Sequence, residues 1–253
     1  MVLSDFEAWS FMPKGPVFGT FLHGLMEYLG HEGFDCVTRD AFDAVQRIRL
    51  QENCESQGLG DIAQPLIEQV IKACSMPLRL PQVAHQPSLI ELPNYRIELE
   101  FLMGVAQFSL TELDAWCCRI ILPGHARAPL RQQEVYGMLK GFIDLTFEYE
   151  GRYYVLDYKS NALGDRLTDY SQEALQAAVL EHRYDLQAGL YLLALHRLLR
   201  VRLGQDYCPT EHLGGAIYWF MRGLGHPSTG GQLGLQVSEQ AIDSLDRLLG
   251  QPG

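Results

Sequence analysis

The sequence lacks the features that define several large classes of protein. It has no run of about 20 apolar residues, the length that a membrane span requires. Its acidic start, Met1 to Glu7, has no apolar signal-peptide core. The six cysteines are scattered, with only Cys117 and Cys118 adjacent, so neither a disulfide framework nor a zinc-ligand spacing is predicted. We therefore expect a cytoplasmic protein with no membrane partner.

A phosphate-binding loop and an excess of positive charge are also missing. No Gly-x-x-x-x-Gly-Lys-[Ser/Thr] segment occurs, which excludes a P-loop ATPase motor within these residues. The 31 acidic and 20 basic residues give a net charge of −11. A chain of this charge repels a polyanion such as DNA at long range. If the protein acts on DNA, we expect the DNA to be delivered by another protein.

Basic side chains are nevertheless concentrated in two parts of the sequence. They are Arg119, Arg127, Arg131 and Lys140, and then His182, Arg183, His196, Arg197, Arg200 and Arg202. Local positive charge of this kind either attracts a phosphate backbone or forms a solvated surface. The sequence leaves both interpretations open.

Length and periodicity indicate an α/β fold with a central mixed β-sheet flanked by helices. A chain of 253 residues with 47% hydrophobic content buries roughly 70–75% of its unfolded surface as one domain. Helices are predicted at 18–28, 40–50, 61–73 and 237–249, with a further helical stretch that is broken near Glu181 and ends near Leu203. Strands are predicted at 95–105, 138–148, 152–159 and 215–221, with a connector at 77–93 and a mobile glycine-rich loop at 223–234.

The most informative segment is a predicted β-hairpin that carries charged residues. A turn at Glu150-Gly151-Arg152 folds one strand back against the next. Side chains alternate between the two faces of a strand, so Asp157 and Lys159 share a face while Tyr158 points away. Pairing of the two strands brings Asp144 beside Asp157. Two carboxylates and a lysine then converge at the end of the hairpin.

This combination suits metal-dependent hydrolysis of a phosphodiester. Mg²⁺ prefers carboxylate oxygens and completes its octahedral shell with water and phosphate oxygens, so Asp144 and Asp157 fit as ligands. Lys159 either orients or deprotonates the attacking water or offsets charge on the phosphate. The alternative for Asp-x-Lys is an exposed ion pair without function. The apolar run Tyr153–Leu156 is typical of a strand buried on both faces, which favours the functional interpretation.

Longer segments resemble a known family, the C-terminal nuclease domain of the RecB subunit of bacterial RecBCD (exodeoxyribonuclease V). The matching segments are Leu139–Leu145, Glu150–Tyr154, Leu156–Asn161, His182–Gln187, Leu190-Tyr191, Leu195–Arg197, Gly214–Tyr218 and Arg222-Gly223. They run in family order from about Gly19 to Gly223. The resemblance implies a restriction-endonuclease-like PD-(D/E)XK core over about residues 95–223, a helical part over about 18–75, and a single RecB-type nuclease domain over 1–253.

The resemblance also implies which residues form the metal site. Asp144, Asp157 and Lys159 match the two acidic positions and the lysine of the PD-(D/E)XK motif. His23 matches a histidine on an early helix that completes the metal site in the family, and the backbone carbonyl of Tyr158 is an expected further contact. Without the resemblance, His23 would be taken for an ordinary residue of an amphipathic helix.

Two further elements of the family site are matched. The strand at 95–103 resembles the family strand with an acidic active-site residue; Glu98 is the better match, and Glu100 would share its face. Gln187 and Tyr191 lie four apart on one helical face and match a Gln-x-x-x-Tyr element beside the active site, with Tyr184 on nearly the same face. The alternatives are a polar edge-strand face for the glutamates, a core position for Tyr191 and a backbone-capping role for Gln187.

The implied function is Mg²⁺-dependent cleavage of DNA during double-strand break processing. The implied substrate is single strands from an unwound duplex. Mn²⁺ or Ca²⁺ would be able to substitute for Mg²⁺ in binding. The implied partners are RecB helicase domains, RecC-like and RecD-like subunits, and the recombinase RecA. The alternatives are a non-catalytic docking module and a freestanding PD-(D/E)XK exonuclease. The presence of Asp144, Asp157 and Lys159 argues against a docking module, because crowded carboxylates oppose each other's ionisation and serve no purpose in a scaffold.

Overall fold

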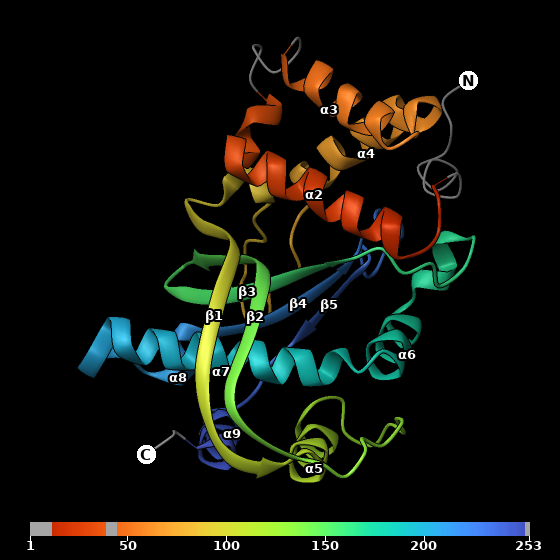
Figure 1. Cartoon of the computed structure of the whole chain (residues 1–253). Coiled ribbons are helices and arrows are strands. Elements are labelled where there is room, and N and C mark those ends of the chain that lie inside the picture. The colour runs from red at the N-terminus through yellow and green to blue at the C-terminus, as the bar shows by residue number, and fades with distance from the viewer. Residues whose placement is uncertain (1–11, 39–44, 251–253) are drawn as a thin grey trace.

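The computed structural model describes residues 12–38 and 45–250, and these form a five-stranded mixed sheet (Figure 1). The strands, in their order across the sheet, are β1 (Asn94–Ser109), β2 (Glu134–Tyr149), β3 (Arg152–Lys159), β4 (Leu213–Phe220) and β5 (Gln232–Leu235). Strands β3 and β4 run parallel, and every other neighbouring pair is antiparallel. The prediction of an α/β fold with a central mixed sheet is confirmed.

Helices cover both faces of the sheet, so the described chain has three layers (Figure 1). The helices on one face are α2 (Pro16–Glu32), α3 (Val45–Ser56) and α4 (Ala63–Ser75). Those that contribute to the core on the opposite face are α5 (Leu110–Ile120), α6 (Gln172–Glu181), α7 (Tyr184–Leu203) and α9 (Glu239–Leu249), and the short α8 (Pro209–His212) precedes β4. Each face therefore has its own hydrophobic core, which we call the α2-side core and the α7-side core.

Strand β3 lies in the middle of the sheet and is buried on both faces, as its apolar run predicts. Tyr154 and Leu156 belong to the α2-side core, while Val155 belongs to the α7-side core. The turn before it consists of Glu150 and Gly151, whose φ angles of 51° and 78° are those of a type I′ hairpin turn, which matches the twist of the strands.

Several predicted helices are confirmed with shifted bounds. The helices predicted at 18–28 and 61–73 occur as α2 and α4, and the break near Glu181 separates α6 from α7. The helix predicted at 40–50 begins at Val45 and extends to Ser56 within the described residues, while residues 39–44 lie outside them. No described helix has the length and apolar character needed to cross a bilayer.

The loop predicted over 223–234 extends too far toward the C-terminus, because residues 232–234 belong to β5. Gln232 begins β5, and its buried side chain accepts a hydrogen bond from Arg79 N at 2.8 Å and donates one to Pro77 O at 3.0 Å. Gly231 has a φ of 75°, and a Cβ there would lie 2.5 Å from Phe220 O. At this position, therefore, glycine permits close packing of the backbone rather than motion.

Helix α5 was not predicted from the sequence. Ser109 caps it by accepting a hydrogen bond from Thr111 N at 3.3 Å, and Glu112 follows three positions after Ser109. This Ser-x-x-Glu pattern is a helix-start signal. Leu113 and Trp116 are buried at helical spacing, so the signal was present in the sequence between two predicted strands.

Candidate active site

The two predicted acidic residues lie where β2 and β3 separate. The paired part of these strands ends at Leu145 and Leu156, and the next residues outward are Asp144 and Asp157. Beyond this point β2 continues to pair with β1 alone. The Tyr158 N–H donates to Asp144 Oδ2 at 2.8 Å, so the Asp144 carboxylate satisfies a backbone donor that a continued ladder would have used. The carboxylates converge because the hairpin register places them at this fork.

Asp157 is a buried carboxylate that lies near one negatively charged residue, Asp144, and one positively charged residue, Lys159. It is 4% exposed and forms a close ion pair with Lys159, two residues along the same strand face. Burial and then the negative charge of Asp144 raise the pKa of Asp157 from 3.8 to about 6, against the opposing effect of Lys159. A cation bound between the two carboxylates would relieve this repulsion.

His23 reaches the fork from α2, the helix that covers the sheet on this side. Its Nδ1 lies 3.2 Å from Asp144 Oδ2. Burial lowers the pKa of His23, but the hydrogen bond and charge of Asp144, together with the charge of Asp157, outweigh burial, so the net pKa is raised. The structure thus places His23 beside Asp144, where the resemblance had predicted a third ligand.

Helix α7 contributes from the opposite face of the sheet. Lys159 Nζ donates to Gln187 Oε1 at 3.1 Å, and Gln187 Nε2 donates to Tyr191 Oη at 2.8 Å. Tyr191 Oη lies 3.5 Å from Asp157 Oδ2, and the Tyr184 ring centroid lies 3.9 Å from Lys159 Nζ. The structure therefore brings both residues of the Gln-x-x-x-Tyr element into contact with the charged pair on β3.

Of the two glutamates considered on β1, Glu98 is the one at the site. It lines a small cavity with His23 and Asp144, and burial followed by the charge of Asp144 raises its pKa. Glu100 is exposed and pairs instead with Lys140 at 2.9 Å.

The backbone at Glu98 interrupts the regular alternation of β1. Glu98 has a φ of 47°, in the left-handed region. Ile97 packs against the α2-side core, whereas Leu99, two residues later, packs against the α7-side core. Strict period-two reasoning therefore fails at this residue, next to the fork.

The donor set suits a hard divalent cation. Carboxylate oxygens from Asp144 and Asp157 and the imidazole of His23 belong to one connected group of contacts, and these donor types bind Mg²⁺ or Mn²⁺. Among the described residues, no three or more His, Cys, Asp or Glu side chains stand in a finished metal-binding arrangement. Instead, Asp144 contacts His23 and Asp157 contacts Lys159, and a bound cation would replace these contacts.

A cavity of about 320 Å³ gives access to the site. Its walls come from Gly19, Thr20 and His23 of α2, from the end of β3 with the two residues after it, and from Tyr184. Lys159 lines this cavity. Helix α2 packs closely against the residue that follows β3. A Cβ on Gly19 would lie only 2.7 Å from Ser160 Oγ.

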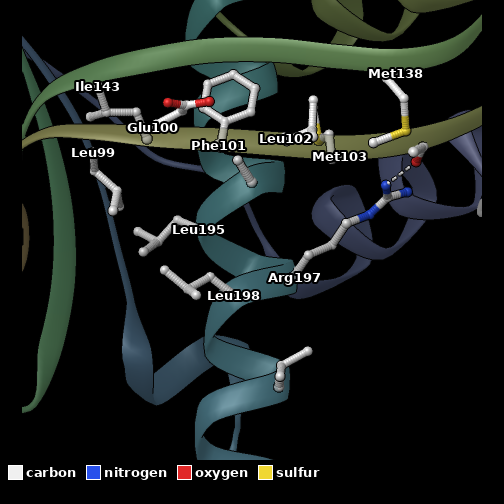
Figure 2. A pocket seen from close by; sticks show the side chains of 13 residues that line it. Leu99, Glu100, Phe101, Leu102, Met103, Met138, Ile143, Leu195, Arg197 and Leu198 are labelled. Carbon is white, nitrogen blue, oxygen red and sulfur yellow. Dashed lines mark hydrogen bonds between the residues drawn. The ribbon is translucent and has the colours of Figure 1, made fainter.

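A larger groove of about 610 Å³ lies elsewhere, between the edge strand β1 and α7. Figure 2 shows that Leu99, Leu195 and Leu198 project into it. Its two charged residues are already paired, Glu100 with Lys140 and Arg197 with Asp246. It therefore lacks the chemistry of a hydrolytic centre despite its size.

One residue near Lys159 was not predicted from the sequence as part of the site. Tyr218 of β4 is fully buried, and its ring centroid lies 5.3 Å from Lys159 Nζ. It is the partner of Asp157 in the parallel pairing of β3 and β4. Its position depends on which strand lies next to β3, and the sequence alone does not show this.

Comparison with known proteins agrees with this geometry. The model of the PD-(D/E)XK nuclease superfamily matches residues 9–250. The chain is 39% identical over 221 residues to the RecBCD enzyme subunit RecB of Escherichia coli (strain K12), covering 86% of this chain and 18% of that protein. It is 30% identical over 227 residues to RecB of Haemophilus influenzae, covering 87% and 17%. With RecB of Mycobacterium tuberculosis it shares 46% identity over 111 residues, 40% of this chain and 10% of that protein.

The chain thus spans less than a fifth of the length of these RecB relatives. Their similarity confirms the predicted resemblance to RecB and is consistent with a RecB-like nuclease domain. The family match covers nearly all of the chain and includes the fork between β2 and β3. The chain belongs to the PD-(D/E)XK nuclease superfamily.

Proposed function

We propose that this chain is a metal-dependent deoxyribonuclease domain of the RecB type. It would hydrolyse phosphodiester bonds of DNA strands during RecBCD-type double-strand break processing. The observation that carries the proposal is the fork of β2 and β3, where Asp144 and Asp157 converge beside Lys159 and His23. Membership of a nuclease superfamily and similarity to RecB subunits support it.

The metal ligands in this proposal are Asp144, Asp157, His23 and the backbone carbonyl of Tyr158. PD-(D/E)XK nucleases generally use divalent metal ions, and the hard oxygen donors favour Mg²⁺, with Mn²⁺ or Ca²⁺ able to substitute in binding. Such an ion lowers the pKa of a bound water and neutralises charge on a phosphate. Asp157 suits this role because burial and then the charge of Asp144 raise its pKa, and a bound cation would favour its ionised form.

The other residues act on the substrate or on one another. Lys159 lines the access cavity, where it would orient the attacking water or stabilise charge on the phosphate as an ammonium, or deprotonate the water as a neutral amine. Gln187 accepts a hydrogen bond from this ammonium and is held by Tyr191. Glu98 would add negative charge at the His23 side of the site.

The arrangement of basic residues supports delivery of DNA by other protein parts. Arg127 and Arg183 form buried or half-buried ion pairs with Asp185. Arg197 and Arg200 both pair with Asp246. These arginines from the basic clusters are therefore engaged within the domain, and the net charge of −11 opposes capture of DNA from solution. We propose RecB helicase domains with RecC-like and RecD-like subunits as the delivery system.

The domain boundary and the location are part of the same proposal. Both helical layers of residues 12–38 and 45–250 pack on one sheet, which supports the proposal that the chain, 1–253, is a single nuclease domain. Similarity to bacterial RecB proteins supports a cytoplasmic setting in a bacterium. We also propose, from the family resemblance, that the domain docks RecA.

The decisive experiment is degradation of linear single-stranded DNA by this chain with Mg²⁺ and with EDTA. Lys159→Ala serves as the control for contaminating nucleases. Cleavage that requires both the metal and Lys159 is expected. Calorimetric titration with Mn²⁺ should show binding to Lys159→Ala and none to Asp157→Ala. Tight Mn²⁺ binding to Asp157→Ala would contradict the assignment of Asp157 as a metal ligand.

A further inference from the structure

The ammonium of Lys159 is enclosed by groups from three elements. It pairs with Asp157 on β3 and donates to Gln187 Oε1 at 3.1 Å. It also lies over the rings of Tyr184 and Tyr218, 3.9 Å and 5.3 Å from their centroids, at distances where a cation is attracted by an aromatic face. A lysine side chain has a flexible four-carbon stem, so these surrounding groups determine where the ammonium sits.

The hydrogen bonds of the Tyr191 hydroxyl determine how the side-chain amide of Gln187 is oriented. Tyr191 Oη donates its only proton to Phe142 O at 2.7 Å, so it accepts from Gln187 Nε2 at 2.8 Å. The amide oxygen of Gln187 must then point the other way, toward Lys159. This is the face that Tyr218 also contacts, with its Oη 3.2 Å from Gln187 Oε1.

Tyr218 connects the strand that flanks Asp157 to the first turn of α7. Its hydroxyl donates to Tyr184 O at 2.6 Å, the shorter of its two contacts. Burial and then the charge of Asp157 hold the pKa of Tyr218 well above its usual range, so the hydroxyl remains a donor. In the β3–β4 pairing Tyr218 is the partner of Asp157. One side chain therefore links the strand beside Asp157 to the turn of α7 that carries Gln187.

We propose that Tyr218 is a positioning residue, which holds the start of α7, and with it Gln187, so that the Lys159 ammonium stays at the reaction site. This inference rests on the proposed nuclease function. Without the Tyr218 hydroxyl, the Tyr184 carbonyl loses its anchor on β4, and the first turn of α7, which carries Gln187, is held less firmly. Lys159 then keeps its ion pair with Asp157 but loses its fixed position, and small displacements of a catalytic group reduce rates strongly.

The test uses Tyr218→Phe, which keeps the ring and deletes the hydroxyl. Tyr154→Phe is the matched control, because Tyr154 is also a fully buried strand tyrosine whose hydroxyl donates to a backbone oxygen, Pro81 O at 3.4 Å, in the opposite core. We expect kcat on single-stranded DNA to fall about 10- to 100-fold in Tyr218→Phe. KM for DNA and Mn²⁺ affinity should stay near wild type, and Tyr154→Phe should leave kcat unchanged.

A coupling measurement tests whether the effect passes through Gln187. If Tyr218 acts by holding this amide, Tyr218→Phe combined with Gln187→Ala lowers kcat little more than the more damaging single change. Effects that multiply would overturn the proposed route, since independent sites add in free energy.

A second readout does not depend on cleavage. The chain has four lysines, Lys14, Lys72, Lys140 and Lys159, and the Lys159 side chain is 11% exposed against 60% for Lys14. With acetic anhydride, Tyr218→Phe should raise the acetylation of Lys159 relative to Lys14, whereas Tyr154→Phe should not.

The two proposals fail in different ways. Equal Lys159 labelling in the wild type and both variants, or equal kcat for Tyr218→Phe and Tyr154→Phe, would overturn the role of Tyr218. A wild-type chain that cleaves DNA without Lys159, or that neither cleaves DNA nor binds Mn²⁺, would overturn the nuclease proposal, and the labelling would still decide whether Tyr218 holds the lysine.

Discussion

Replacing Asp157 with asparagine should remove a pH-dependent loss of stability from the metal-free protein. In the folded chain the pKa of Asp157 is about 6, against 3.8 for the ordinary carboxyl. Between these values the folded state keeps the proton and the unfolded state releases it. The resulting stabilisation is fully present below about pH 4 and is lost as the pH rises through 6. Asp157→Asn has no such proton to lose.

The size of the effect follows from the same two pKa values. A difference of about 2 units corresponds to about 3 kcal/mol of unfolding free energy, of which about 1 kcal/mol is lost between pH 5 and pH 8. Because Asp157 is 4% exposed, solvent screening removes little of it. The Asp157→Asn variant should therefore gain about 1 kcal/mol relative to the wild type over this pH range.

The assay is urea unfolding in EDTA at several pH values between 5 and 8. Asp165→Asn is the matched control, because Asp165 is 77% exposed and pairs with Lys14 on the surface, so its curve should run parallel to that of the wild type. Saturating Mn²⁺ should stabilise the wild type by about 2.7 kcal/mol at 100 times its Kd and leave Asp157→Asn unaffected. A wild-type curve parallel to that of Asp157→Asn would refute the burial argument, and equal stabilisation of both by Mn²⁺ would refute the ligand role.

Two further predictions concern a residue of the site on α2 and the turn before β5. His23→Ala should weaken Mn²⁺ binding about 10- to 100-fold, a loss seen even for groups that only support a metal ligand; calorimetry would check this, and unchanged affinity would remove His23 from the site. Gly231→Ala should destabilise the fold by about 1–3 kcal/mol in urea, because its φ of 75° is strained for alanine and a Cβ would lie 2.5 Å from Phe220 O. A neutral effect would restore the interpretation of this segment as a loose loop.

Local patterns carried much of the information about the hairpin. The Glu150-Gly151 turn was predictable because a two-residue type I′ turn needs left-handed backbone at both positions. The apolar run of β3 indicated a strand buried on both faces. Strand alternation predicted that Asp157 and Lys159 lie on the same face of the strand, and the structure shows that they form an ion pair.

Other features were missed because they depend on distant parts of the chain or were given too little weight. β5 was taken for a loop because its glycines suggest motion, while the packing of Gly231 against Phe220 is visible only in the fold. Helix α5 had a start signal at Ser109 and Glu112 that was overlooked between two strands. The irregular backbone at Glu98 has no pattern of its own, since it arises where β1 passes from one core to the other.

By itself, the sequence determined the hairpin, the acidic and basic residues on it and the family to which they point, because turns and strand alternation are local properties. The tertiary structure alone decided how the site is enclosed. It places His23 of α2 on one side of the fork, Gln187 and Tyr191 of α7 on the other, and Tyr218 of β4 beside Asp157. These contacts join residues far apart in the chain, and they form because packing on both faces of one sheet brings separate elements to the same strand end.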